Sequence, residues 1–297
     1  MRTFRISHRT QYTYGKAVRF GVHRLMIRPR DAHDMRILDS SLTVAPQADI
    51  RWAFDTFGNS VALLSFHEAS SELIIASELV LRRYGFDEPL VRIERDAGPY
   101  PFDYDPQDSV DLAPLRVIHC PQDQTIVTEW IKSVMPVVPT GSLQVLDLIS
   151  SAIHETFTYR RREEQGVQSP ARTITTASGT CRDYAYLFME AARSLGFAAR
   201  FVTGYLYDPA ADTTPQEADD SNAVSGAGAT HAWADVFLPG AGWIEFDPTN
   251  SIDASRDLVR VATTRMPEQA QPVIGTYSHD GAVLLDMDVQ VFVTRSD

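Results

Sequence analysis

The chain has 297 residues, enough for two domains of ordinary size, each with a substantial core. Its formal net charge of −12 and its pI near 5.1 argue against non-specific binding to nucleic acids or anionic membranes, which requires clustered Lys and Arg. No apolar run reaches the roughly 20 residues that span a bilayer, and the first residues lack the apolar segment of a signal peptide. Only Cys120 and Cys181 are present, so we expect no disulfide framework, no cysteine-based zinc site and a reducing, cytoplasmic setting.

Residues 1–98 are predicted to form a β-sandwich-like domain. Alternating or β-branched runs are separated by turn signals such as Phe57-Gly58-Asn59, and helical periodicity is absent. The predicted strands are 4–14, 37–44, 50–54, 60–66 and 73–84. A segment rich in Pro and Asp, 99–122, follows as the expected linker.

Residues 123–260 change to a 3.6-residue period and are predicted to form an α+β core. The expected elements are helices over 126–134, 143–157 and 181–195, a strand over 197–207 and a hairpin around 239–242. Ser142 is the expected N-cap of the second helix.

Two further segments complete the chain. Residues 208–230 are rich in Ala, Ser, Gly, Asp and Thr, and we expect a mobile acidic loop, either plainly solvated or acting as a flap that favours basic substrates. The alternating apolar residues of 283–293 predict a half-buried strand. It belongs to a C-terminal section, 261–297, that packs on the core or on the N-terminal domain.

Cys181 is placed at the start of a predicted helix. Thr180-Cys181-Arg182-Asp183 fits the capping box, in which Thr180 and Asp183 satisfy each other's backbone N–H groups. Cys181 is then the first helical residue, where free N–H groups and the helix dipole favour an anion. The structural alternative is a small buried hydrophobic residue, which is the commoner fate of a lone cysteine.

The helix start alone cannot make a thiol reactive. An ordinary thiol is only about 3% thiolate at pH 7, and making it mostly thiolate takes roughly 2.7 kcal/mol. A helix terminus typically supplies about 0.3–1 kcal/mol. A nearby imidazolium is therefore required.

His231 and Asp247 lie on the two predicted strands of a hairpin. With an odd loop such as 239–241, paired residues have numbers that sum to 480, so Asp247 lies opposite Trp233 and His231 is a diagonal neighbour on the same face. A regular four-residue loop would put the two on opposite faces unless a bulge intervened. Alone, His231 is a strand histidine and Asp247 a turn residue before proline. Together with Cys181 they indicate a Cys–His–Asp arrangement, in which His accepts the thiol proton and Asp fixes its tautomer.

The motifs around these residues resemble the transglutaminase-like superfamily. Three motifs in order carry the resemblance: Gly179-Thr180-Cys181-Arg182-Asp183-Tyr184-Ala185, His231-Ala232-Trp233-Ala234-Asp235-Val236 and Gly242-Trp243-Ile244-Glu245-Phe246-Asp247-Pro248. The N-terminal stretch is similar to the β domain that precedes this core in the bacterial branch, through His23-Arg24-Leu25-Met26-Ile27-Arg28-Pro29-Arg30-Asp31 and Asp55-Thr56-Phe57-Gly58-Asn59. The resemblance implies a papain-like core with Cys181 as nucleophile, His231 as base and Asp247 as the residue that orients it. The sequence departs from the branch at Tyr186, where many relatives have histidine, at Thr264-Arg265-Met266 and at Ile274, which replaces a common arginine.

The expected activity is thiol-dependent acyl chemistry on amide bonds. Hydrolysis, as in a protease, is favoured because the sequence shows no dedicated amine site; a protein-glutamine acyltransferase and a catalytically silent binding module are the alternatives. The Cys181 backbone N–H is the expected first oxyanion donor, and Tyr159 is a candidate second donor, with core packing as its other role. Trp233 and Trp243 are candidate substrate-groove residues, with packing in the hairpin core as the alternative.

The expected partner is a peptide or protein substrate, without nucleic acid or membrane. No cofactor and no metal are expected, because the other histidines show no ligand spacing. The sequence leaves self-association into a homo-oligomer open.

Overall fold

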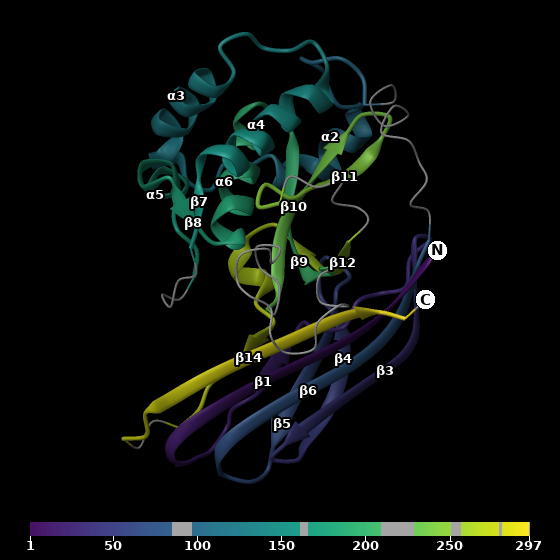
Figure 1. Cartoon of the computed structure of the whole chain (residues 1–297), viewed down its shortest axis with the longest axis vertical. Coiled ribbons are helices and arrows are strands. Elements are labelled where there is room, and N and C mark those ends of the chain that lie inside the picture. Colours follow the sequence, from purple (N-terminus) through teal and green to yellow (C-terminus); the bar gives the residue numbers. More distant parts are fainter. Residues whose placement is uncertain (85–96, 161–165, 209–228, 251–256, 279–280, 297) are drawn as a thin grey trace.

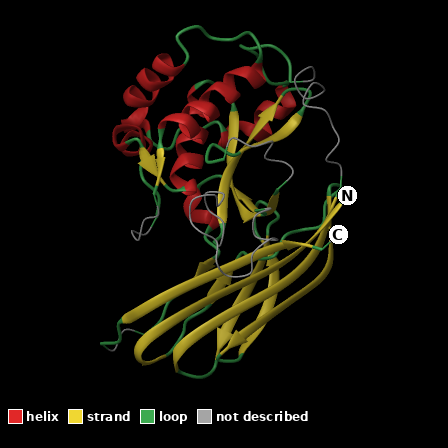
Figure 2. Cartoon of the chain, viewed as in Figure 1, coloured by secondary structure: helices red, strands yellow, loops and turns green. Residues whose placement is uncertain are grey.

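The computed structural model describes residues 1–84, 97–160, 166–208, 229–250, 257–278 and 281–296. A β-sandwich forms the lower half of the molecule in Figure 1, and the two termini lie beside each other at one end of it. The helices of the described residues lie in the upper half, where they pack on a smaller sheet (Figure 2). The predicted class, α+β with an N-terminal β-sandwich-like domain, is confirmed. No helix among the described residues combines the length and apolar character needed to span a bilayer.

Two four-stranded antiparallel sheets form the sandwich. Their strand orders are β14-β1-β6-β3 and β13-β2-β5-β4. The strands are β1 (Arg2–Val18), β2 (His23–Leu25), β3 (Met35–Ala45), β4 (Ala48–Phe54), β5 (Ser60–Phe66), β6 (Ser70–Arg83), β13 (Val273–Ile274) and β14 (Leu284–Arg295). Each predicted run of this region is a strand, whereas β2 has only three residues, too few for alternation to reveal it.

The C-terminal section completes the sandwich. β14 pairs with β1 from Phe4↔Arg295 to Tyr14↔Leu284, and β13 pairs with β2. The predicted half-burial holds for Val291 and Val293, which are buried. It fails for Leu285, which is 66% exposed, because β14 is an edge strand that is open to solvent at its first residues.

The upper half is built on a sheet of order β11-β10-β9-β12. Its elements are α2 (Pro106–Leu112), the 3-10 helices η1 (Ala113–Leu115) and η2 (Pro121–Asp123), α3 (Gln124–Val134), α4 (Ser142–Thr156), β7 (Thr158–Tyr159), α5 (Pro170–Thr176), β8 (Ser178–Gly179), α6 (Cys181–Ser194), β9 (Ala198–Leu206), β10 (His231–Leu238), β11 (Gly242–Phe246), β12 (Leu258–Thr264) and the 3-10 helix η5 (Pro267–Ala270). The segment 99–122, expected as a linker, contains α2, η1 and the start of η2. It packs on this half, because Tyr104 and Leu112 are buried against Ala198.

The N-terminus of α4 differs from its prediction. Ser142 is the first helical residue and not the N-cap, a position that Gly141 takes. The Ser142 hydroxyl donates to the carbonyl of Pro99 at 2.7 Å, so it ties the expected linker to the helix instead of capping it.

Helix α6 is the centre of the upper half. α3, α4 and α5 pack around it and β10 lies along it, so that even its charged residues Asp183 and Glu190 are fully buried. Burying large side chains such as Leu187 and Phe188 contributes about 1.5–3 kcal/mol each. The helix ends before Gly196, whose φ of +94° suits the left-handed conformation that stops a helix. The sequence pattern predicts one apolar face; the structure shows a helix buried on nearly all sides.

The two halves share a continuous apolar cluster. Phe4 and Ile6 of β1 pack with Tyr205 of β9 and Val259 of β12. The Tyr205 hydroxyl donates to the carbonyl of Ile27 at 3.0 Å, across the junction. The sheet that carries the candidate site is therefore fixed on the sandwich.

Candidate active site

Cys181 is the first residue of α6, as predicted, and is 5% exposed. Thr180 donates its backbone N–H to the Asp183 carboxylate at 2.8 Å and its hydroxyl to the same oxygen at 3.0 Å. These bonds fix the start of the helix through the predicted capping box. The free N–H groups of the first turn therefore lie around Cys181, where they favour negative charge on the sulfur.

The segment that leads into Cys181 is clamped by Asp183. The Asp183 carboxylate also accepts the backbone N–H of Gln168 at 2.7 Å. Gly179 permits this close approach, because a Cβ there would lie 2.9 Å from the Cβ of Asp183 and 3.1 Å from Nε2 of Gln168. Gly179 also pairs with Tyr159 in the short parallel ladder of β7 and β8. The position of the sulfur is thus set by groups on several different segments.

His231 and Asp247 meet as the odd-loop register predicts. Leu238 pairs with Gly242 and Ala234 with Phe246, so paired numbers sum to 480 and the turn is 239–241. Nε2 of His231 lies 2.8 Å from Oδ2 of Asp247, and the two side chains are 0% and 1% exposed. A buried imidazole and a buried carboxylate therefore form a direct pair at the end of the hairpin.

The structure adds a partner that the sequence analysis did not assign. Asn250 donates from Nδ2 to Oδ2 of Asp247 at 2.9 Å, and the backbone N–H of Thr249 donates to Oδ1 at 2.9 Å. The second bond joins Asp247 to the residue two positions later, as in an Asx turn. The sequence Asp247-Pro248-Thr249 could have indicated such a turn. His154 of α4 bonds the carbonyl of Thr249 at 2.8 Å, which anchors this turn to the helical layer. The carboxylate is therefore held on both oxygens.

The charges of the site act on one another. Burial alone would lower the pKa of His231, but the charges of Asp247 and of Cys181, and the hydrogen bond to Asp247, raise it to about 10. Burial would raise the pKa of Asp247, but His231, Asn250 and Thr249 hold it below its usual value. The imidazole is therefore positively charged whenever the carboxylate and the sulfur are both negative.

The second ring nitrogen of His231, Nδ1, is the one that Asp247 does not engage. Nδ1 is buried and has no well-aligned hydrogen bond within the described part of the chain, although the Cys181 sulfur is close enough to raise the pKa of the ring. In enzymes without bound substrate, catalytic hydrogen bonds are often long or poorly aligned and tighten only when substrate binds. Arg182 adds a second cation: burial lowers its pKa, and the charge of Cys181 acts in the opposite direction.

The three other candidate site residues, two for a substrate groove and one for the oxyanion, lie in different environments. Trp233 is fully buried and packs with Val202 and Leu206, an environment typical of the packing alternative. Trp243 is half-buried beneath Arg200, whose guanidinium carbon lies 4.0 Å from the ring centre. Tyr159 is half-buried, and its ring packs against that of Tyr184 with a centroid distance of 6.4 Å.

The residues that depart from the family pattern lie apart from the His231–Asp247 pair. The Tyr186 hydroxyl lies 3.1 Å from the sulfur of Cys120. Ile274 is in β13, opposite Arg24, and Thr264 ends β12 with its hydroxyl donating to the carbonyl of Met266. The expected acidic loop lies almost wholly outside the described residues, in 209–228.

The arrangement can perform proton transfer and nucleophilic attack at one sulfur. It combines a buried thiol at a helix N-terminus, a histidine with one free ring nitrogen, and a carboxylate that fixes the other nitrogen. Among the described residues, no group of three His, Cys, Asp or Glu side chains is arranged to hold a metal ion.

Two protein families match the chain. Residues 4–82 match the bacterial transglutaminase-like N-terminal region, and residues 138–248 match the transglutaminase-like superfamily. The second match contains Cys181, His231 and Asp247. The order of the two regions agrees with the order of sandwich and core in the structure.

Similar proteins span nearly the whole chain. An uncharacterized protein of Mycobacterium tuberculosis (strain ATCC 25618 / H37Rv) is 28% identical over 310 residues, covering 99% of this chain and 94% of the relative. An uncharacterized protein of Mycobacterium leprae (strain TN) is 23% identical over 307 residues, covering 98% of each. The crystal structure of a candidate cysteine protease from Cytophaga hutchinsonii superposes with a TM-score of 0.70 at 19% identity, covering 100% of this chain and 93% of that one. The last likeness confirms the predicted core fold.

Proposed function

Because this chain belongs to the transglutaminase-like superfamily, we propose that it is a thiol enzyme that hydrolyses amide bonds in peptides, with Cys181, His231 and Asp247 as its catalytic triad. The observation that carries the proposal is the 2.8 Å bond between His231 and Asp247, beside a cysteine at a helix N-terminus. The proposed setting is reducing and cytoplasmic, where Cys181 stays a thiol.

The first step is transfer of the Cys181 proton to Nδ1 of His231. Nδ1 can accept it because Asp247 accepts the proton on Nε2 and so fixes the neutral tautomer. The product is a thiolate beside an imidazolium, and the charge of Asp247 stabilises the cation. The N–H groups of the first turn of α6 stabilise the thiolate.

The second step is attack on a peptide carbonyl. The sulfur bonds to the carbonyl carbon, and the resulting oxyanion accepts the backbone N–H of Cys181. The imidazolium of His231 returns its proton to the leaving amine, the C–N bond breaks, and a thioester remains on Cys181.

The thioester is then resolved by water, which His231 deprotonates. We favour water over an amine acceptor because the carboxylates next to the sulfur are already engaged. Asp183 accepts from Thr180 and Gln168, and Asp247 pairs with His231, so neither is available to hold a cationic amine.

Alkylation of Cys181 tests the triad. At pH 6, iodoacetamide should modify Cys181 at least tenfold faster than an ordinary thiol, because only a stabilised thiolate persists at that pH. His231→Ala should abolish the advantage, whereas His119→Ala, which removes a ring bonded to Arg265 and not to Asp247, should leave it unchanged. Labelling no faster than that of a free thiol would instead favour a silent module that retains the fold.

A product assay separates hydrolysis from acyl transfer. Incubation with a peptide library should yield cleaved peptides with free carboxyl ends, lost in Cys181→Ala. The same incubation with a fluorescent primary amine should leave the peptides unlabelled. Amine incorporation in place of cleavage would establish a transglutaminase and overturn the choice of water.

A further inference from the structure

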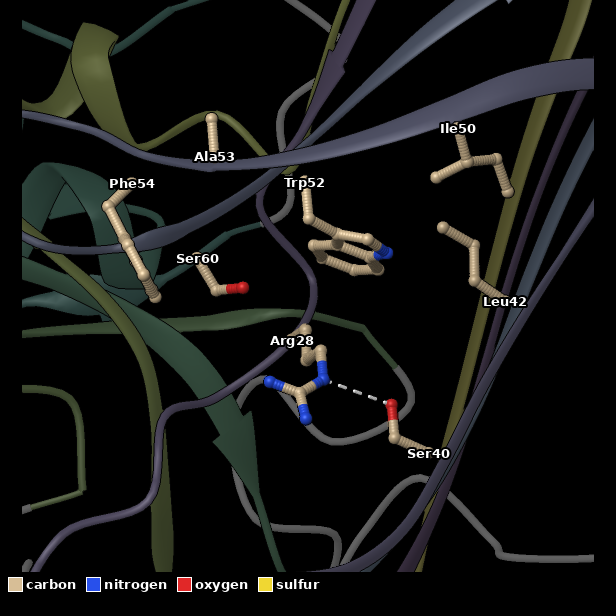
Figure 3. Close-up of a pocket in the computed structure, with 8 residues that line it drawn as sticks. All are labelled: Arg28, Ser40, Leu42, Ile50, Trp52, Ala53, Phe54 and Ser60. Atoms are coloured by element: carbon tan, nitrogen blue, oxygen red, sulfur yellow. Dashed lines mark hydrogen bonds between the residues drawn. The ribbon is translucent and has the colours of Figure 1, made fainter.

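The sandwich is open along one side. β3 and β4 are edge strands of different sheets, and neither pairs with the other. A cavity of about 540 Å³ lies between them, lined by Arg28, Ser40, Leu42, Ile50, Trp52, Ala53, Phe54 and Ser60 (Figure 3). Its volume is in the range of about 300–1,000 Å³ that is usual for small-molecule sites.

The apolar wall of this cavity is an unfilled part of the sandwich interior. Trp52 pairs with Ala62 and therefore faces the same side of its sheet, and Ala62 is fully buried. Yet Trp52 is 45% exposed, and Phe54, two residues further along β4, is 71% exposed. Inward-facing aromatic side chains of a sandwich are normally covered by the opposite sheet. Here β3 ends its sheet on this side, and arginines lie over the rings instead: the guanidinium carbon of Arg28 is 5.8 Å from the ring centre of Trp52, and that of Arg30 is 5.0 Å from the ring centre of Phe54.

One cation projects into the apolar cavity. Nε of Arg28 donates to the hydroxyl of Ser40 at 3.2 Å, and the guanidinium carbon lies 5.8 Å from the ring centre of Trp52. Figure 3 shows the guanidinium of Arg28 below the ring of Trp52 and beside the hydroxyl of Ser40. Among the described residues, no carboxylate forms an ion pair with Arg28. The two terminal nitrogens of Arg28 donate to no described residue. Asp39, next to Ser40 in the chain, accepts the backbone N–H of Ser40.

The lining specifies the chemistry of an occupant. Paired terminal nitrogens of a guanidinium match the two oxygens of a carboxylate. The remaining lining is aromatic, aliphatic or hydroxyl, with no acid among it, so it favours an apolar body attached to that carboxylate. A strongly hydrated or multiply charged anion would leave the ring of Trp52 and the side chain of Ile50 in contact with water.

We infer that the cleft between β3 and β4 is a binding site for a small apolar monocarboxylate of the fatty-acid type, held by Arg28 at its head and by Trp52 and Ile50 along its chain. The site is separate from Cys181 and does not depend on the proposed amide chemistry. It assigns a function to the N-terminal domain itself.

Calorimetric titration of the full-length protein with decanoate, below its micellar concentration, tests the inference. Saturable 1:1 binding should occur, and decanol should bind at least tenfold more weakly because it lacks the charge that pairs with Arg28. Arg28→Gln should weaken decanoate binding at least tenfold. Arg36→Gln, which removes an exposed arginine of β3 outside the cavity, should change it less than twofold.

Fluorescence gives a second readout that does not depend on the arginine variant folding. Decanoate should change the emission of the wild-type protein, and Trp52→Phe should remove that change, because Trp52 is the tryptophan that lines the cavity. Cys181→Ala should bind decanoate as the wild type does. Equal affinity for decanol and decanoate, equal losses in Arg28→Gln and Arg36→Gln, or an emission change that persists in Trp52→Phe would overturn the inference.

Discussion

The two cysteines lie against the same helix in opposite electrostatic environments. Cys181 is the first residue of α6 and Cys120 packs beside Tyr186 further along it, and both are almost completely buried. The sulfur of Cys181 lies near His231 and Arg182, whose pKa values respond to its charge. Cys120 instead lies near the carboxylate of Glu190, which accepts its backbone N–H at 3.0 Å.

The two thiols are buried to a similar extent, so the difference between them lies in the charged groups beside each one. Burial raises the pKa of Cys120; a hydrogen bond to Tyr186 opposes that shift, and the charge of Glu190 adds to it. The groups beside Cys181 are instead the N-terminus of α6 and the imidazole of His231. The same helix therefore presents a candidate nucleophile at its first residue and a structural thiol along its side.

Exchanging each cysteine for alanine should give the largest contrast. Cys181→Ala should lower kcat/KM for an amide substrate by about 10⁴-fold or more, because it removes the attacking atom. Cys120→Ala should stay within roughly threefold of wild type, because Cys120 touches no reacting atom in the proposed mechanism. Steady-state rates with a peptide from the library assay provide the measurement. Comparable losses in both variants would show that the contrast between the thiols is wrong.

Loss of the Asp247 charge should give the next largest effect. Asp247→Asn keeps the shape of the side chain but no longer fixes the tautomer of His231, so kcat should fall by roughly 10³–10⁴-fold. Asn250→Ala, which removes the added hydrogen bond to the carboxylate but keeps the carboxylate itself, should cost far less, about tenfold. The ratio of the two losses in kcat is the quantity to measure. If Asn250→Ala lowers kcat as much as Asp247→Asn does, the amide of Asn250 and not the carboxylate of Asp247 fixes the tautomer of His231.

The parts of the site that could be predicted from sequence are those set by local rules. The capping box at Thr180 and Asp183 depends on residues three apart, and the facing of His231 and Asp247 depends only on the parity of one turn. Both follow from the geometry of a single helix or hairpin, so a pattern of residue types is sufficient.

The parts that could not be predicted depend on packing between distant segments. The nearly complete burial of α6 requires three other helices, and the burial of Trp233 requires β9 and β12 beside β10. The open side of the sandwich is visible only once β3 and β4 are known to be edges, since their alternation alone predicts covered residues. Local periodicity reports which face is apolar, but not whether another element covers it.

Changing the charged groups around Cys120 should alter the free energy of unfolding and not the activity. Glu190 bonds Arg193 at 2.9 Å, with both side chains fully buried, and also accepts the backbone N–H of His119. Glu190→Gln leaves the buried guanidinium of Arg193 bonded to backbone carbonyls but without the Glu190 carboxylate, so the free energy of unfolding should fall by about 3–5 kcal/mol, while the folded enzyme keeps its kcat. Urea unfolding gives the measurement, and Glu129→Gln on the exposed face of α3 is the control, expected within roughly 0.5 kcal/mol. A loss no larger than that control would mean that the pair does not stabilise this region.

The smallest expected effect is a change of kcat/KM with pH. It distinguishes the role of the Cys181 thiolate from that of the His231 proton. The charges of Asp247 and of the Cys181 sulfur raise the pKa of His231 to about 10, so once the thiolate–imidazolium pair has formed, the ring keeps its proton up to that pH and can donate it to the leaving amine. Above pH 10 the proton is lost, and kcat/KM should fall about tenfold per pH unit. Alkylation of Cys181 needs only the thiolate, so its rate should not fall over the same interval. Asp247→Asn should move the fall in kcat/KM to lower pH, because the carboxylate no longer stabilises the imidazolium. A descending limb already near pH 6.5 in the wild type, with circular dichroism unchanged, would contradict a histidine held in its charged form by Asp247.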